Sequence, residues 1–135
     1  KMRLATVLSH LKNICREKMN SINLELEVAE KYLDEMLEAD RVGDYQGFIK
    51  RFDDNELDQF NEEDFHEDVN LMLEDLGAYK NRTLLGHLNG FVDPKYPKNS
   101  RFVWRANYEK NQALIVVGIH QINGVWYVNE SNVSK

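Results

Sequence analysis

The sequence predicts an α+β fold, with helices in the first half of the chain and an antiparallel sheet in the second. Between residues 4 and 39, apolar residues recur every three or four positions, which is the period of a helix with one buried face. After residue 80 the pattern changes to short apolar runs separated by turn residues, which is typical of strands. We therefore expect a single domain over residues 1–135, with helices packed on a curved sheet of three to four strands.

The first helical segment is unusually long, because neither glycine nor proline interrupts it before Gly43. It forms either one helix of about 38 residues or two helices that meet near Asn20. A single helix would measure roughly 57 Å at 1.5 Å per residue, which is longer than a small domain is wide. Residues 1–20 would then be a helical extension, an arm that pairs with the same arm of a second subunit.

Two shorter helices are expected between this segment and the sheet. Asp44 is placed to cap the first of them, and Asn61 to cap a helix over residues 61–76 that ends at Gly77. Three acidic residues directly follow Asn61, in the turn where the helix dipole favours negative charge.

Strands are expected over residues 83–91, 101–109, 112–120 and 125–130, the first weakened by Gly86 and Gly90. Asn123-Gly124 is a preferred sequence for a two-residue hairpin turn between the last two strands. The strand over residues 112–120 is apolar on both faces, so each face needs a cover. Helices cover one face, and the N-terminal arm, a ligand or a second copy of the sheet covers the other.

This order of elements resembles the NTF2-like cone within the broader cystatin-like α+β class. The resemblance covers about residues 24–131, and it depends on the helix 24–39, the turn 43–44, the aromatic helix 45–52, the helix 61–76 and the tail 122–128. It implies a cavity between helices and sheet, and frequent dimerisation through the sheet. Enzymes of this class use carboxylate or His–Asp pairs inside the cone, but no such pair can be assigned here, and a fold does not define a reaction.

A curved sheet would enclose a pocket for a small apolar ligand. The candidate ligand-binding residues are the aromatic and histidine side chains of the strands: His87, Trp104, Tyr108, His120 and Trp126. The alternative is that the aromatic side chains form the core and that the histidines lie at strand ends in water.

A homodimer through the sheet or the N-terminal arm is also expected, with Val103, Val117 and Ile119 as candidate interface residues. The sequence thus favours a non-catalytic binding or assembly module that acts as a homodimer. The alternative is a small-ligand-binding cone with lyase, isomerase or hydrolase chemistry.

The charge pattern suggests a third function. Residues 25–75 are strongly acidic and the flanking segments are basic, although the net charge of the chain is only −6. Such runs are usually solvated helix faces, but an acidic surface could instead bind a basic partner. That surface would comprise Glu62, Glu63, Asp64, Glu67 and Asp68. The acidic centre argues against nucleic acid, because phosphates are bound by basic surfaces.

Several kinds of chemistry are not expected. No phosphate-binding motif occurs and the histidines lack metal-ligand spacing, so we expect neither a cofactor nor a metal. Cys15 lies on the apolar side of the first helix and is expected in the core, not as a nucleophile. No apolar run is long enough to cross a membrane and no signal peptide is recognised, so we expect a soluble cytoplasmic protein.

Overall fold

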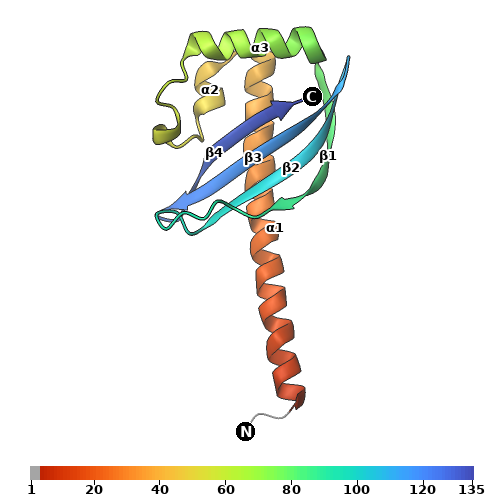
Figure 1. Cartoon of the computed structure of the whole chain (residues 1–135), viewed down its shortest axis with the longest axis vertical. Coiled ribbons are helices and arrows are strands. Elements are labelled where there is room, and N and C mark those ends of the chain that lie inside the picture. The colour runs from red at the N-terminus through yellow and green to blue at the C-terminus, as the bar shows by residue number, and fades with distance from the viewer. Residues whose placement is uncertain (1–3) are drawn as a thin grey trace.

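The computed structural model describes the backbone of residues 4–135 and the side chains of residues 9–135, and it has the α+β architecture that the sequence predicts (Figure 1). The helices are α1 (Leu4–Val42), α2 (Tyr45–Ile49), the single 3₁₀ turn η1 (Asp54–Glu56) and α3 (Glu62–Leu76). The strands are β1 (Tyr79–Leu88), β2 (Asn99–Tyr108), β3 (Gln112–Ile122) and β4 (Val125–Ser134).

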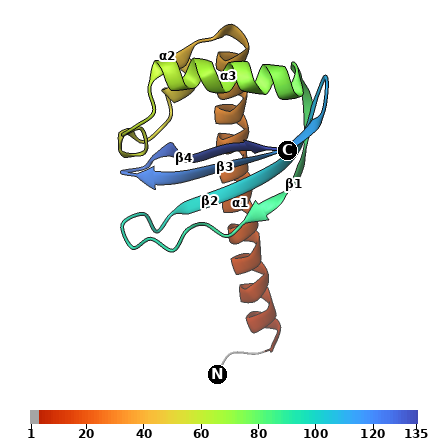
Figure 2. The same cartoon turned by 45° about the horizontal axis from the view of Figure 1, so that its top comes forward.

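The four strands form an antiparallel meander, in which each strand pairs with the next one along the chain. The β3–β4 hairpin turns at Asn123 and Gly124, whose φ values of 50° and 80° confirm the predicted turn. In β1 the register shifts between Leu84 and Gly86, so the bulge lies where glycine interrupts the strand pattern. The sheet is curved and does not close into a barrel (Figure 2).

Helix α1 is continuous over 39 residues, so the alternative of a break near Asn20 is excluded. At 1.5 Å per residue it is about 58 Å long. Its C-terminal half lies against the sheet, and its N-terminal half extends beyond the sheet edge (Figure 1). Of the predicted arm, residues 1–20, the structure describes the side chains from residue 9 onward, and every side chain of residues 9–21 is exposed. Cys15 is therefore exposed and not in the core as expected, because the part of α1 that carries it lies beyond the sheet.

The core lies between the C-terminal half of α1 and one face of the sheet. From α1 it contains Ala29, Leu33 and Met36, and from β2, β3 and β4 it contains Phe102, Trp104, Ile115, Val117, Ile119 and Val128. On β2 the core residues alternate with more exposed ones, as expected for a sheet with one covered face, whereas on β3 the alternation ends at Gly118 and His120, which are also buried. No described helix covers the opposite face, where Leu114 is exposed and Val116 is half-buried.

Helix α3 begins with the predicted cap. The Asn61 side chain accepts a hydrogen bond from the Asp64 backbone N–H at 2.8 Å, and the Asp64 carboxylate accepts one from the Asn61 N–H at 3.3 Å. The helix ends at Gly77, whose φ of 77° favours glycine. In the two views of the fold, α3 lies across the C-terminal end of α1 at one end of the sheet (Figures 1 and 2).

The segment after α2 extends the sheet at its β4 edge. Phe52 forms a parallel bridge with Val128. The Asp53 N–H donates to the Val128 carbonyl at 3.1 Å, and the Val128 N–H donates to the Arg51 carbonyl at 2.7 Å. These bonds hold the Asp53 side chain beside β3.

Candidate functional site

The structure does not bring the five predicted ligand-binding residues into one site. Trp104 and Tyr108 are buried on the face of the sheet that α1 covers. His87 is exposed on β1, and Trp126 packs partly buried against the core. His120 alternates with the core residues of β3 and therefore points to the opposite face.

His120 is held in a closed polar cluster. Its Nε2 lies 2.9 Å from Oδ2 of Asp53, and its Nδ1 lies 3.2 Å from Nδ2 of Asn129. The Tyr96 ring stacks on the imidazole with 4.1 Å between centroids, and His120 is only 2% exposed. With the proton on Nε2, that atom donates to Asp53 and Nδ1 accepts from the Asn129 amide, so both ring nitrogens are hydrogen-bonded within the cluster. The cluster thus ties the 51–53 segment to the sheet.

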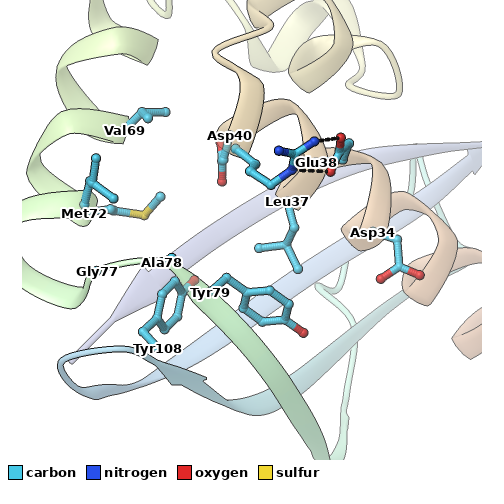
Figure 3. Close-up of a pocket in the computed structure, with 12 residues that line it drawn as sticks. Asp34, Leu37, Glu38, Asp40, Val69, Met72, Gly77, Ala78, Tyr79 and Tyr108 are labelled. Atoms are coloured by element: carbon cyan, nitrogen blue, oxygen red, sulfur yellow. Dashed lines mark hydrogen bonds and ion pairs between the residues drawn. The ribbon is translucent and has the colours of Figure 1, made fainter.

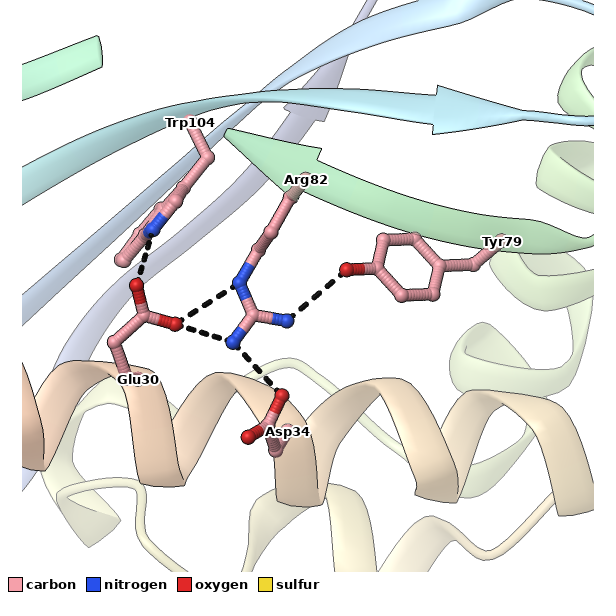
Figure 4. Close-up of polar contacts among 5 residues, drawn as sticks. All are labelled: Glu30, Asp34, Tyr79, Arg82 and Trp104. Carbon is pink, nitrogen blue, oxygen red and sulfur yellow. Dashed lines mark hydrogen bonds and ion pairs between the residues drawn. The ribbon is translucent and has the colours of Figure 1, made fainter. Parts of the chain in front are cut away.

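Trp104 belongs to a second polar network, which joins α1 to the sheet (Figure 4). Its indole Nε1 donates to Oε1 of Glu30 at 2.8 Å, and Nε of Arg82 donates to Oε2 of the same carboxylate at 3.0 Å. Arg82 also pairs with Asp34 at 2.8 Å and donates to the Tyr79 hydroxyl at 3.0 Å. The network fixes the positions of Asp34 and Tyr79.

A cleft of about 350 Å³ opens beside this network, where α1, α3 and the start of β1 meet (Figure 3). This volume is at the lower end of the range for small-molecule sites. Its apolar wall is formed by Leu37, Val69, Met72, Leu73 and Ala78, and its polar wall by Asp34, Glu38, Asp40, Arg41, Tyr79 and Tyr108. We call it the Asp40–Tyr108 cleft. Of the predicted ligand-binding residues, it contains only Tyr108.

The tight α3–β1 connection shapes the floor of the cleft. The Glu109 N–H donates to the Ala78 carbonyl at 2.9 Å, and the Lys110 N–H donates to the Leu76 carbonyl at 2.8 Å. A Cβ on Gly77 would lie 2.8 Å from Cβ of Glu109, so this close approach requires glycine.

Space remains on both sides of α3. A second cleft of about 300 Å³ lies toward β3 and β4, and shares Leu37, Asp40, Val69 and Met72 with the first. The face of α3 that carries Val69 and Met72 is therefore incompletely packed against the sheet. The C-terminal half of α1, by contrast, packs on the sheet in the core.

Asp40 differs from the other carboxylates of the cleft. Asp34 pairs with Arg82, and Glu38 pairs with Arg41 at 2.6 Å. Asp40 makes neither an ion pair nor a hydrogen bond with the side chains that the structure describes. Burial raises the pKa of Asp40 to about 7, and the nearby Asp68 carboxylate contributes. Near neutral pH the carboxyl group is therefore part protonated and can donate or accept a hydrogen bond.

Tyr108 is the second unusual group of the cleft. It is 8% exposed, and its buried hydroxyl has no hydrogen-bond partner in the part of the chain whose side chains are described. Burial raises its pKa to about 12, with contributions from Asp40 and Tyr79. A buried hydroxyl without a partner costs roughly 1–3 kcal/mol, which a hydrogen bond to a ligand would offset.

Asp40 does not stand out in the sequence as a site residue, because it lies in a strongly acidic helical segment. The helical period could have identified it, since Asp40 follows Met36 by four residues and Leu33 by seven. Both of these residues are buried in the core. An acidic residue that continues a buried stripe indicates a carboxylate directed toward the interior.

The three candidate interface residues do not share a surface. Val117 and Ile119 are fully buried within the single chain, against α1. Val103 is half-buried on the opposite face of the sheet. On α3, four of the five residues of the predicted acidic surface are exposed and Asp64 is half-buried.

Among residues 4–135, no helix is long and apolar enough to cross a membrane. Among residues 9–135, whose side chains the structure describes, no three His, Cys, Asp or Glu side chains are grouped so that they could hold a metal ion. No protein-family model matches the chain, and no curated protein matches it. The architecture is compatible with a cone-like α+β fold.

Proposed function

We propose that this domain binds a small, largely apolar molecule in the Asp40–Tyr108 cleft. The observation that carries the proposal is the Tyr108 hydroxyl, which is buried in the cleft wall without a partner. Buried polar groups are nearly always hydrogen-bonded, so an unpartnered hydroxyl beside a cleft is a suitable contact for a ligand.

Two further features support a ligand here. The cleft is mostly apolar with a few convergent polar groups, which is the usual composition of a small-molecule site. It lies between the helices and the sheet, which is where the resemblance to the NTF2-like cone implies a cavity. The polar network of Glu30, Arg82 and Trp104 holds Tyr79 and Asp34 in fixed positions at the edge of the cleft, so the site is preorganised.

The proposal is tested by screening small aromatic and aliphatic fragments against the ¹⁵N-labelled protein by NMR. Binding should shift the backbone signals of Ala78, Tyr79 and Tyr108. Val69→Trp should fill the cleft and abolish these shifts. Asn70→Trp is the matched control, because Asn70 is exposed on α3 and outside the cleft, and it should leave binding unchanged.

If no fragment shifts the cleft signals, or if Val69→Trp binds as well as the parent protein, the proposed site is wrong. The dispersion of the NMR spectrum shows in each case whether the variant is folded, so a loss of binding is not confused with unfolding.

A homodimer through the arm is a second candidate function, because the arm exposes apolar side chains. Leu11, Ile14 and Met19 are 52%, 48% and 65% exposed, and pairing with a second arm would cover them. Light scattering should then give twice the chain mass, and Leu11→Lys with Ile14→Lys should give the monomer mass. Asn13→Lys, on the opposite side of the arm, should leave the dimer intact. A monomer at high concentration would contradict this function.

A further inference from the structure

Building on the proposed function, we infer that the ligand of the Asp40–Tyr108 cleft is a hydrophobic amine, that is, an ammonium group carried on an aromatic or aliphatic body. The cleft combines an acidic group without a counter-ion, two tyrosines and apolar walls.

The distribution of charge excludes an anionic ligand. Among the described residues that line the cleft, Arg41 is the only base, and its guanidinium is bound to Glu38. Arg82, next to the cleft, is bound to Glu30 and Asp34. An anion would therefore meet the Asp40 carboxyl group with no free cation to balance it. An ammonium group would supply the missing counter-charge.

The polar groups of the cleft also suit the donors of an ammonium group. A primary ammonium has three N–H donors and no acceptor, so it needs oxygen acceptors and aromatic faces. Asp40 offers carboxylate oxygens, and the unpartnered Tyr108 hydroxyl offers a lone pair. The rings of Tyr79 and Tyr108 lie 5.6 Å apart at 74° and add aromatic surface for a cation.

The apolar part of the ligand would contact the side of the cleft formed by α3. Val69 and Met72 line this side, and Leu37 of α1 faces the same space (Figure 3). Because Val69 and Met72 also line the second cleft, a small shift of their side chains could enlarge the site toward β3.

The class of ligand determines whether the affinity of the cleft rises or falls with pH. The charged and titratable groups around Asp40 are Asp34, Glu38 and Arg41 on α1, Asp68 on α3, and Tyr79 and Tyr108 on the strands. With the pKa of the Asp40 carboxyl group near 7, an ammonium ligand must displace its proton at lower pH. Affinity should therefore fall about tenfold per pH unit below 7 and become constant between pH 7.5 and 8.5. A neutral ligand that accepts a hydrogen bond from protonated Asp40 would show the opposite trend.

The inference is tested with three probes that share one apolar body and differ in charge: 2-phenylethylamine, 2-phenylethanol and 3-phenylpropanoate. Each is titrated into the full chain by NMR at pH 7.5 and pH 5.5. We expect the amine to bind at least tenfold more tightly than the alcohol at pH 7.5, and the carboxylate to leave the cleft signals unchanged.

Variants then assign the effect to one carboxyl group. Asp40→Asn should lower the affinity for the amine at least tenfold, and it should change the affinity for the alcohol by no more than about twofold. Glu67→Gln removes the same charge from an exposed position on α3 and should change neither. The pH titration of the parent protein requires no substitution, so the inference can be tested even if Asp40→Asn fails to fold.

The outcomes separate this inference from the proposed function. If the amine and the alcohol bind equally tightly in the cleft, the inference that the ligand is an amine is wrong, but the proposed binding site is not contradicted. If none of the probes, nor any fragment of the wider screen, shifts the cleft signals, the binding function itself is wrong.

Discussion

The indole Nε1 of Trp104 donates a hydrogen bond of 2.8 Å to Glu30, and so joins the centre of the sheet to the helix that covers it (Figure 4). Trp104 is fully buried, and Glu30 also accepts hydrogen bonds from Arg82. One carboxylate therefore satisfies donors from both β1 and β2. This network makes α1 and the first two strands a rigid frame beside the cleft.

Glu30→Ala should destabilise the fold by about 3 kcal/mol, because it leaves the Trp104 N–H without an acceptor and removes one partner of Arg82. Urea denaturation measures the free energy of unfolding. Glu27→Ala, on the exposed side of the same helix, is the control and should cost less than about 0.5 kcal/mol. Equal effects of the two substitutions would show that the network contributes no stability.

Tyr108→Phe should leave the ligand-free protein as stable as the parent or more stable, by up to about 2 kcal/mol. The reason is that it removes a buried hydroxyl that has no partner. Tyr32→Phe is the matched comparison, because the Tyr32 hydroxyl donates to the Trp126 carbonyl at 3.0 Å, and its loss should cost about 1 kcal/mol. A loss of stability in Tyr108→Phe as large as that in Tyr32→Phe would mean that the Tyr108 hydroxyl is bonded in solution.

Asp40 should make stability depend on pH. Its pKa of about 7 in the folded protein exceeds the ordinary value of 3.8, so the folded state binds the proton more tightly than the unfolded state. Raising the pH from about 4 to 7 therefore favours unfolding, and the penalty is complete above pH 7. The two pKa values set an upper limit of about 4 kcal/mol, which partial solvent screening reduces.

Asp40→Asn removes this titration. The stability difference between Asp40→Asn and the parent should be small near pH 4 and should increase in favour of the variant up to pH 7. Denaturation curves at intervals between pH 4 and 8 measure it. A difference that stays constant across this range would show that the Asp40 pKa is ordinary.

Gly118→Ala should be destabilising, because the added Cβ would clash with Oδ1 of Asn129 and lie 3.0 Å from Cβ of Glu130. Moving Asn129 would break its contact with His120 and loosen the link to Asp53. We expect a decrease of several degrees in the midpoint of thermal unfolding. At Gly86, where a Cβ would meet no atom within 4 Å, alanine should have little effect. Similar midpoints for the two variants would contradict the tight contact.

The sequence predicts the parts of the fold that depend on local rules. The cap at Asn61 and the turn at Asn123-Gly124 are confirmed because each is determined by a few neighbouring residues. The helical period of α1 is also confirmed. The helical period does not show which part of the long apolar stripe meets the sheet. For this reason it wrongly places Cys15 in the core, whereas Cys15 is exposed.

The polar clusters depend on contacts between distant residues, which periodicity does not encode. Asp53 and His120 are separated by 67 positions, and Glu30 and Trp104 by 74. Strand alternation places His120 opposite the core residues of β3, but it does not show that a segment beyond α2 covers it. The candidate site depends on how α3 crosses α1, so the sequence identifies only Tyr108 of its two unusual groups.

Binding of an amine in the Asp40–Tyr108 cleft is tested most directly by a crystal structure of the protein soaked with 2-phenylethylamine. We expect electron density for the probe between Asp40, Tyr108 and Val69, with its nitrogen at hydrogen-bond distance from the Asp40 carboxylate. A cleft filled by the protein's own side chains, with the probe absent at saturating concentration, would contradict it.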